Sequence, residues 1–477
     1  MTEGRIFGRM LLFVLPLMAT NVLQTLYNAA DMMVVSLSSE PDAVGAIGIT
    51  GPFVTMLVNI FIGFSTGANV IVARHLGSKN DTAASKAVHT SVTLSLIFGV
   101  IAAVVGVAVS RGVLVLMGAE GKLLDLATTY TVIYFLGMPF LSVTNYAVAI
   151  FRAKGDTRTP LVIMSLSGIV NVTMNVFFVL VCGLSVEGVA IATAAANLLS
   201  AVLLIVKLMR EEGACHLDLK ELKIDRIQLS WIVRIGLPAG LQGALFSISN
   251  ILINSSILRV NNAVAPEGSA FAPVVRGNAA VATLTGFIYT ATTAVYTAVI
   301  TFTSQNAGAK KYDRVSKVMG CGYVITFAIA AIGSSIVFLL HKPLIALYGV
   351  TDGAVGTLEH IAYETAMARL WIETLPCFLC AFMDVGSAVV RGFGKSVTSM
   401  IIALTGSCLF RVVWLLTVFE ALETIETIYV SYPISWTLTA IAQFVVAIVL
   451  ISRAKRNSGD GSIDEPHPVL RKHSKIA

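Results

Sequence analysis

GANVIVARHLGSKNDTAASKAV, residues Gly67 to Val88, has a counterpart in the second half of the chain, AVITFTSQNAGAKKYDRVSKVM, which begins at Ala298. Equivalent positions carry the same residue at Gly77/Gly308, Lys79/Lys310 and Lys86/Lys317. RAKGDTRT at 152–159 likewise corresponds to RGFGKSVT at 391–398, and Leu15-Pro16 with Asn28 to Leu237-Pro238 with Asn250. The chain is therefore a duplicated unit. In membrane proteins, two related bundles that face each other can build a central site that opens to either side.

The composition is that of a polytopic membrane protein. Of 477 residues, 56% are apolar and only 13% are charged, whereas roughly a quarter of the residues in soluble domains are charged. Apolar runs long enough to cross ~30 Å of hydrocarbon lie at 10–37, 45–73, 88–109, 128–151, 160–181, 188–209, 231–258, 277–304, 318–341, 361–390, 398–419 and 427–452. We predict an all-α integral membrane fold of twelve transmembrane helices in two six-helix bundles related by a pseudo-twofold axis.

The repeat also divides the chain. We expect residues 1–215 to form an N-terminal six-helix lobe and residues 231–455 a C-terminal one. Between them, 216–230 (HLDLKELKIDRIQLS) mixes apolar and charged residues, which predicts a short helix on the cytoplasmic surface of the membrane. The tail, 456–477, is polar and contains Pro, Ser and Gly, so we expect it to be disordered.

Most of the 33 Lys and Arg residues fall in the loops on the side of the two termini. The positive-inside rule then places both termini in the cytoplasm of a cell whose plasma (inner) membrane holds the protein. The net charge of +6 is explained by this topology and does not indicate nucleic-acid binding. In the repeated motif we expect the glycines to permit a tight helix exit and the lysines to meet lipid phosphates.

The first span carries an ionisable residue, Asp31, which costs ~2.5–3.5 kcal/mol at a membrane helix centre and so marks a candidate functional site. Asn21, Gln24, Asn28 and Asp31 are spaced three, four and three apart and share a sector of about 80°. This face predicts the wall of a polar cavity. A face satisfied only by neighbouring helices is the alternative.

Two more spans of the first half carry polar stripes, Ser167-Asn171-Asn175 and Thr193-Asn197. Counted from the outer ends of their spans, Asp31, Asn175 and Thr193 lie at a similar depth, ~9–12 Å. Oxygen ligands at one depth could form a cage for Na⁺. They equally suit a site where a desolvated Asp takes up a proton. For the Asn and Thr residues, hydrogen bonding between helices is the alternative.

The second half differs from the first at these positions, because Asp31 aligns with Ile253, Asn171 with Phe410 and Asn175 with Trp414. Its seventh span offers Asn250 and Asn254 as cavity residues. Its acids are Glu364, Glu373 and Asp384 in the tenth span, where Arg369 and Glu373 can neutralise one another. Asp384 is a second candidate coupling acid or a partner for a cation near Arg391. Aromatic and Met candidates for the cavity wall are Tyr27, Phe53, Met56, Tyr146, Phe287, Tyr289 and Tyr296.

No ATP-binding loop, HExxH or GxSxG motif occurs, so we expect no enzyme activity, no cofactor and an ion gradient as the energy source. Together, LYNAADMMVVSL around Asp31, GANVIVARHLG, RAKGDTRTP, GVAIAT at 188–193 and TSQNAGAKKYDR resemble multidrug and toxic compound extrusion (MATE) transporters of bacterial type over residues 8–452. The resemblance implies cation-coupled export of organic, often cationic and lipophilic, compounds by alternating access.

The family's first-half cation site corresponds here to Asp31, Asn171, Asn175 and Thr193. Depth in the membrane and helical spacing predict the same cluster. Many members with a first-half site have Asp where this chain has Asn175, so one carboxylate is present where two are usual. That departure favours H⁺ slightly over Na⁺, and no metal other than Na⁺ at Asp31 is expected. The expected partners are small organic molecules and membrane lipids, with the protein as a monomer.

Three other functions are alternatives for a chain of this composition. A flippase for lipid-linked oligosaccharides or polysaccharides, from the same superfamily, is the closest alternative, for which only Arg369, Arg411 and Arg276 could line a basic cavity. A membrane scaffold or receptor would not need polar stripes at matched depth. A membrane enzyme would need paired acids or a His cluster.

Overall fold

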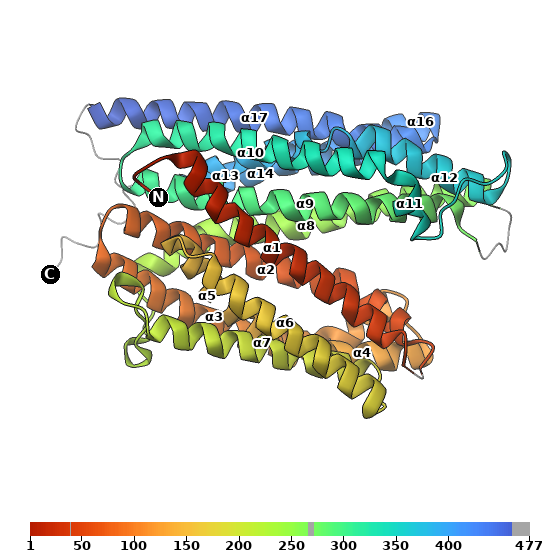
Figure 1. Ribbon diagram of the computed structural model, residues 1–477, viewed down its shortest axis with the longest axis horizontal. Coiled ribbons are helices and arrows are strands. Elements are labelled where there is room, and N and C mark those ends of the chain that lie inside the picture. The colour runs from red at the N-terminus through yellow and green to blue at the C-terminus, as the bar shows by residue number, and fades with distance from the viewer. Residues whose placement is uncertain (39, 266–270, 460–477) are drawn as a thin grey trace.

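The computed structural model describes residues 1–38, 40–265 and 271–459, and every regular element within these ranges is a helix (Figure 1). The first half contains α1 (Ile6–Val35), α2 (Ala43–Gly77), α3 (Asp81–Leu116), α4 (Gly121–Leu136), α5 (Met138–Lys154), α6 (Arg158–Val176) with the π-helical turn η1 (Phe177–Val181), and α7 (Val186–Met209). The second half contains α8 (Arg226–Val264), α9 (Pro273–Gly308), α10 (Tyr312–Leu339), α11 (His341–Ala346), α12 (Leu358–Arg369), η4 (Leu370–Thr374), α13 (Phe378–Gly392), α14 (Ser396–Ala403), η5 (Leu404–Leu409), α15 (Phe410–Trp414), η6 (Leu415–Phe419), α16 (Glu420–Leu422) and α17 (Ile425–Gly459).

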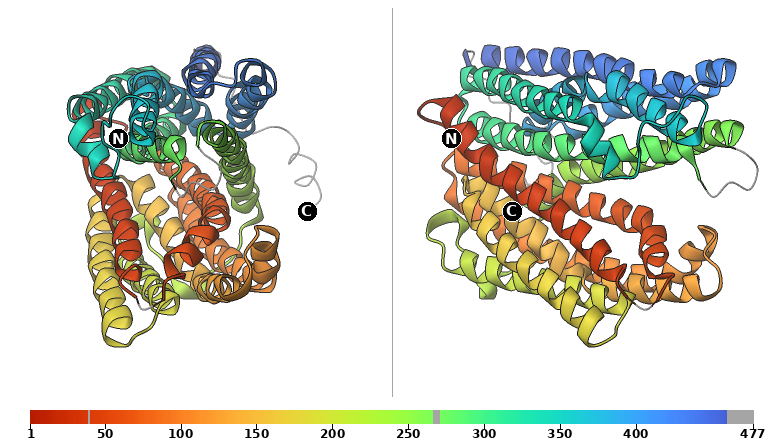
Figure 2. Two further views of the ribbon diagram at one scale, coloured as in Figure 1. Left: turned by 90° about the vertical axis from the view of Figure 1, so that its right-hand side faces the viewer. Right: turned by 45° about the vertical axis from the view of Figure 1, so that its right-hand side comes forward.

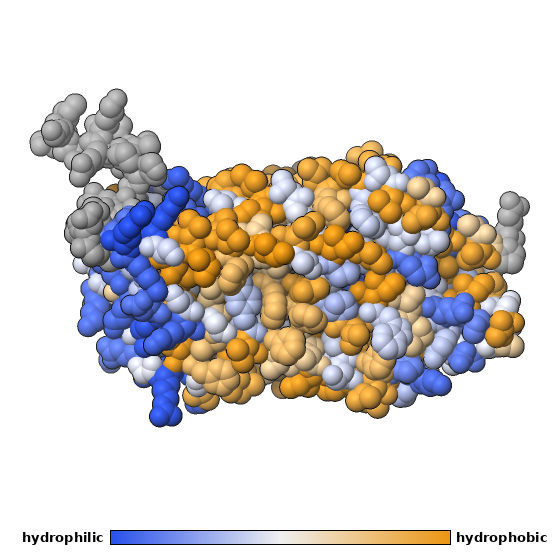
Figure 3. Space-filling model, turned by 90° about the horizontal axis from the view of Figure 1, so that it is seen from above, coloured by the Kyte–Doolittle hydropathy of each residue, from blue (hydrophilic) through white to orange (hydrophobic). Residues whose placement is uncertain are grey.

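The predicted all-α membrane fold is confirmed. In the described ranges, 11 helices are long and apolar enough to cross a membrane, and a twelfth span is formed if the bent pair α4 and α5 counts as one. This pair bends by 48° where Pro139, near the start of α5, lacks the backbone N–H that a continuous helix requires. Figure 3 shows apolar side chains around the middle of one face and hydrophilic ones gathered at both ends, the pattern of a membrane-spanning protein.

The helices form two layers (Figures 1 and 2). Helices α2 to α7 make one layer, and α9 to α17 make the other. The first helix of each half runs between the layers. Helix α1 contacts α9 and α10 of the second half as well as α6 of its own half, and Figure 1 shows it crossing diagonally from one layer to the other. Helix α8 packs against α2 and α3 of the first half and against α14 and η5 of its own.

The contact of α2 with α8 depends on glycine. A Cβ atom at Gly63 would lie 2.1 Å from the Gly240 backbone nitrogen, and one at Gly67 would lie 2.4 Å from the Ile232 carbonyl oxygen. A Cβ at Gly236 would lie 2.6 Å from the Cα of Phe64. The two backbones therefore approach at distances that only glycine permits.

The repeated motif makes the same kind of contact twice. A Cβ atom at Gly77 would lie 2.0 Å from the Gln305 carbonyl oxygen, and one at Gly308 would lie 2.1 Å from the Arg74 carbonyl oxygen. The turns that leave the two helices are instead made by Lys79 and Lys310, whose φ angles are 57° and 55°. Our expectation that the glycines permit the tight helix exit was therefore wrong. They allow the two halves to approach, and the lysines adopt the left-handed conformation.

The linker is not the helix that we predicted for 216–230. It consists of 3-10 turns at Gly213–Cys215 and Leu219–Glu221, and α8 already begins at Arg226. The Asp218 N–H donates to His89 Nε2 (3.1 Å) and the Asp225 N–H donates to Thr90 Oγ1 (3.0 Å). These bonds fix the linker to α3, and of its apolar side chains Leu217 is buried whereas Leu219, Ile224 and Ile227 are exposed. At the other end, α17 continues to Gly459, and the rest of the predicted tail lies outside the described residues.

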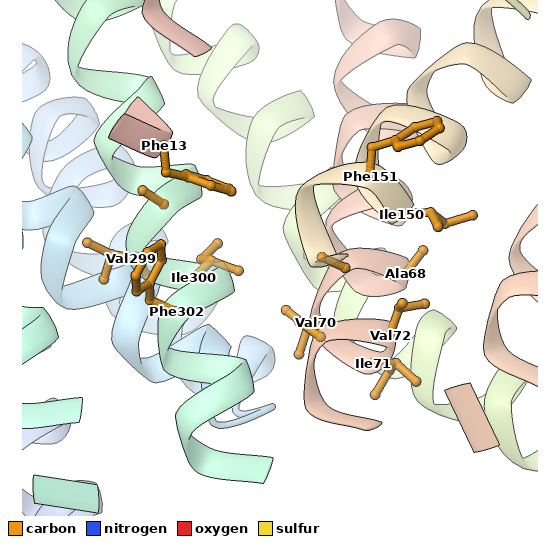
Figure 4. Close-up of a cluster of buried hydrophobic side chains, with 14 of the residues drawn as sticks. Phe13, Ala68, Val70, Ile71, Val72, Ile150, Phe151, Val299, Ile300 and Phe302 are labelled. Atoms are coloured by element: carbon orange, nitrogen blue, oxygen red, sulfur yellow. The ribbon is translucent and has the colours of Figure 1, made fainter. Parts of the chain in front are cut away.

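The largest apolar core joins both halves (Figure 4). The ring of Phe13 on α1 meets the ring of Phe302 on α9 edge to face, with centroids 5.6 Å apart. Ala68, Val70, Ile71 and Val72 of α2 and Ile150 and Phe151 of α5 belong to the same cluster. Two predicted cavity residues, Tyr146 and Phe53, are buried among apolar side chains in this and a smaller core. Their expected place in a cavity wall was therefore wrong.

Candidate functional site

Side chains along the polar face of α1 contact α9, contact α6 or are exposed. The Asn21 amide donates to the backbone oxygen of Thr290 on α9 (3.3 Å), and the Tyr27 hydroxyl donates to the backbone oxygen of Ser165 on α6 (3.2 Å). Gln24 and Asn28 are exposed. The tyrosine ring also covers Gly168, where a Cβ atom would lie 1.9 Å from it. Helix α1 is thus held against α6 one turn before Asp31.

The four predicted coupling residues lie in one hydrogen-bonded chain. The Asn175 amide on α6 donates to Asp31 Oδ1 on α1 and to Asn171 Oδ1 (3.3 Å). The Asn171 amide in turn donates to Thr193 Oγ1 on α7 (3.5 Å). Asn175 is completely buried and Asn171 nearly so, whereas Asp31 is half-buried. The hydrogen-bonded chain therefore links α1, α6 and α7, and Asn175 is the member that contacts the carboxylate.

Two features of this cluster favour the binding of a positive charge. Asp31 forms no ion pair with any residue in the described ranges. The Asn175 Oδ1 atom is buried and accepts no hydrogen bond there, although a buried polar atom without a partner costs about 1–3 kcal/mol. A cation or a proton held between this oxygen and the carboxylate would remove both penalties. The donor set, a carboxylate with carboxamide and hydroxyl oxygens, suits hard cations and protons.

An apolar cluster closes one side of this site. Val34 and Val35 at the end of α1 pack in one core with Tyr130 of α4 and Val189 of α7. Thr193 and Asn197 are half-buried on α7, and the backbone oxygen of Asn197 accepts a hydrogen bond from Thr144 (3.4 Å). The structure thus places Asn197 on α7 without joining its side chain to the chain that begins at Asp31.

The equivalent place in the second half is apolar. Ile253, which aligns with Asp31, is buried beside Ile257 and Leu415. Phe410 and Trp414 align with Asn171 and Asn175, and their ring centroids are 5.7 Å apart. The scaffold is therefore repeated, but the cluster around Asp31 is not.

The second half instead contains a cavity of about 330 Å³. Three predicted cavity residues line it, Asn250, Asn254 and Tyr289. Its other walls include three charged side chains, Arg369, Glu373 and Arg411, and the rings of Tyr432 and Trp436. As the i, i+4 spacing predicted, Arg369 and Glu373 form an ion pair, with Nε and Oε2 2.8 Å apart.

A match to a protein-family model along most of the chain identifies the family. The family model described as MatE matches residues 16–177 and, separately, residues 238–417. This chain belongs to the MATE family. The two matches fall in the two copies of the repeat. A MATE protein is a transporter and not an enzyme, so the protein is a multi-pass membrane transporter, as the resemblance implied.

Similar proteins cover nearly the whole MATE chain. This chain is 25% identical over 461 residues to the probable multidrug resistance protein YoeA of Bacillus subtilis. The alignment covers 94% of this chain and 93% of that protein. It is 24% identical over 452 residues to the multidrug export protein MepA of Staphylococcus aureus, with 94% and 95% covered. A solved structure of a multidrug resistance MATE family transporter in the outward-facing conformation superposes with a TM-score of 0.85 and 21% identity, covering 95% and 98%.

Another candidate acid of this MATE chain, Asp384, lies apart from the Asp31 cluster. It is half-buried on α13 and forms no ion pair in the described part of the chain. The neighbouring Arg391 donates instead to the Tyr296 hydroxyl (2.7 Å) and to Gln242 Oε1. Asp384 and Arg391 therefore form no ion pair among the described residues, and both roles suggested for Asp384, coupling acid and partner for a cation at the cytoplasmic end, stay predictions.

Sequence reasoning missed part of the cavity in the second half. Asn278, Tyr432 and Trp436, from two separate spans, were not singled out, and Arg411 was named only as a possible lining residue of a basic cavity. The only signal in the sequence was the presence of two arginines inside apolar runs, since buried charges in membranes usually have a function. Nothing in their spacing indicates that Arg369 and Arg411 meet.

Proposed function

We propose that this transporter is a cation-coupled antiporter that exports organic compounds by alternating access, with the coupling ion bound at Asp31. When H⁺ or Na⁺ binds from outside, it neutralises the carboxylate, and the hydrogen bonds that join α1 to α6 change. Because α1 also contacts the second half, a change at Asp31 can reach both layers. Export of drugs or toxic metabolites is consistent with the names of the two relatives, which are those of multidrug resistance and export proteins.

One observation carries the proposal: an unpaired carboxylate lies beside a buried carboxamide oxygen that accepts no hydrogen bond in the described chain. Such a pair of oxygens is stabilised by a bound cation or proton and destabilised without one. We also propose that the protein is a monomer in the plasma membrane with both termini in the cytoplasm. Its two six-helix lobes would be joined by the 216–230 linker.

The direct test is transport by purified protein in liposomes, with a proton gradient and a sodium gradient imposed separately. Efflux of a fluorescent organic dye should follow one of the two gradients and stop when that gradient is dissipated. Equal rates with either gradient and with none would contradict coupled antiport.

Asn175→Asp is expected to shift coupling toward sodium. A second carboxylate in contact with Asp31 would supply the charge that Na⁺ needs in an oxygen cage. We expect the ratio of sodium-driven to proton-driven efflux to rise on the order of tenfold. Asn197→Asp, the same substitution on α7 away from this contact, is the control and should leave the ratio unchanged. An unchanged ratio in Asn175→Asp would show that this contact does not select the ion.

A further inference from the structure

The cavity in the second half lies at the meeting of α8, α9, α12, η4, α13, α15 and α17. The proposed coupling cluster consists of other residues, on α1, α6 and α7. The cavity volume, about 330 Å³, is at the lower end of the range found for small-molecule sites, roughly 300–1,000 Å³. It is therefore large enough for a molecule of one or two rings.

Two of the three charges in the cavity cancel. Glu373 is almost fully buried, accepts a hydrogen bond from Arg369 Nη2 at Oε1 (3.0 Å), and its Oε2 lies 2.8 Å from Arg369 Nε in an ion-pair contact. The two side chains therefore form a buried ion pair with one charge-assisted hydrogen bond. The remaining nitrogen of Arg369, Nη1, donates to the backbone and side-chain oxygens of Asn278. Neither member of the pair is left to neutralise another group.

The third charge, Arg411, has no counter-ion in the described chain. Its side chain is buried, with 3% exposed, and Nε donates to Ser435 Oγ (2.9 Å). The guanidinium lies 4.2 Å from the ring centroid of Tyr432 and 5.8 Å from that of Trp436. Its Nη2 atom is buried and donates to no described residue. A buried charge without a partner is costly, so an external anion would be bound favourably here.

We propose that this cavity binds an aromatic solute that carries a carboxylate, and that Arg411 Nη2 donates to that carboxylate. The walls supply the rest of the recognition. Tyr289 and Trp436, whose ring centroids are 6.1 Å apart, offer a surface for the flat part of the solute. The amides of Asn250 and Asn254, on the cavity side of α8, add donors. The proposal rests on the transport function proposed above and names an anionic or zwitterionic substrate class for it.

The charge balance separates this ligand from other classes. The net charge of Arg369, Glu373 and Arg411 is one positive unit, which disfavours a purely cationic guest and matches one carboxylate. A lipid-linked diphosphate, the ligand of the alternative flippase function, would bring more negative charge than one free guanidinium can neutralise. The cationic substrates implied by the family resemblance would have to bind without contact to this arginine.

The test is equilibrium binding to the purified full-length protein in nanodiscs, with no ion gradient. Calorimetric titration would compare 2-naphthoate, the neutral 2-naphthamide and the cation 2-naphthylmethylammonium, which share one ring system. We expect the carboxylate to bind about tenfold or more tightly than the amide, because the bond to a charged donor is lost in the amide. The cation should bind most weakly.

Variants then assign the preference to one residue. Arg411→Gln should reduce the affinity for 2-naphthoate to that for 2-naphthamide, while Arg411→Lys should keep part of the preference. Glu373→Gln frees Arg369 and should tighten binding of the carboxylate. Arg276→Gln, which removes an exposed arginine on α9 outside the cavity, is the matched control and should not change the affinity. Thermal unfolding of each variant would show whether it remains folded.

Three results would overturn the proposal. They are equal binding of the three ligands by the wild type, retention of the carboxylate preference in a folded Arg411→Gln variant, and displacement of 2-naphthoate only by a polyprenyl diphosphate or by inorganic anions. These outcomes do not depend on ion coupling. A failed gradient experiment with intact carboxylate binding would contradict the antiport proposal alone.

Discussion

Asp31→Asn is expected to abolish gradient-driven efflux. The substitution keeps the size of the side chain and its hydrogen-bonding capacity toward Asn175, but it removes the only charge in the cluster formed with Asn171 and Thr193. Without that charge, the site can neither take up a proton nor neutralise Na⁺. Dye efflux from liposomes should therefore fall to the level of protein-free liposomes under either gradient.

Two controls make the result specific. Asp42→Asn removes an exposed carboxylate just before α2 and should leave efflux unchanged. Equilibrium binding of 2-naphthoate should persist in Asp31→Asn, because the cavity that contains Arg411 is built from other helices. Wild-type efflux by Asp31→Asn, at equal abundance in the membrane, would refute the proposed coupling site.

Gly63→Ala is expected to destabilise the seam between the halves strongly. The added methyl would lie 2.1 Å from the Gly240 backbone nitrogen and 2.8 Å from the Ala239 carbonyl carbon. Backbone atoms cannot move aside as a flexible side chain can, so α2 and α8 must separate. We expect a loss of about 2–3 kcal/mol, measured as a fall in the unfolding midpoint of roughly 2–3 °C for a chain of this length.

The matched control lies on the same helix. Gly51 has no heavy atom within 4 Å of an added Cβ, so Gly51→Ala should leave the midpoint unchanged or raise it slightly, as alanine is the better helix former. Equal midpoints for Gly63→Ala and Gly51→Ala would mean that the close contact of α2 with α8 does not support the folded state.

The sequence predicted the fold through its periodicities. Twelve apolar runs and a repeated motif are enough for the span count and the duplication, because apolar length alone determines whether a helix can cross a membrane. The cluster around Asp31 was also predictable. Regular spacing along a helix sets which side chains share a face, and the depth of a residue follows from its distance to the end of the span.

Contacts between distant spans could not be predicted in the same way. Arg369 and Arg411 lie on different helices, and their meeting in one cavity depends on how α12 and α15 are packed. The linker was mistaken for a helix because its apolar residues suggest an amphipathic pattern, whereas Leu217 is buried in the main core. Tyr146 was predicted to line a cavity but lies in the core, because helical spacing does not distinguish a cavity wall from a core.

The crossing of α1 has a consequence for biosynthesis. Its early residues, Met10 and Phe13, are buried in a core shared with Phe302 and Val318, which are translated much later. When the ribosome has completed the first six spans, this part of α1 still lacks its final neighbours, and its apolar surface must remain in contact with lipid or with the insertion machinery. Helix α1 is thus synthesised before α9 and α10 but reaches its final packing only with them, and residues 1–215 released alone would be an incomplete folding unit.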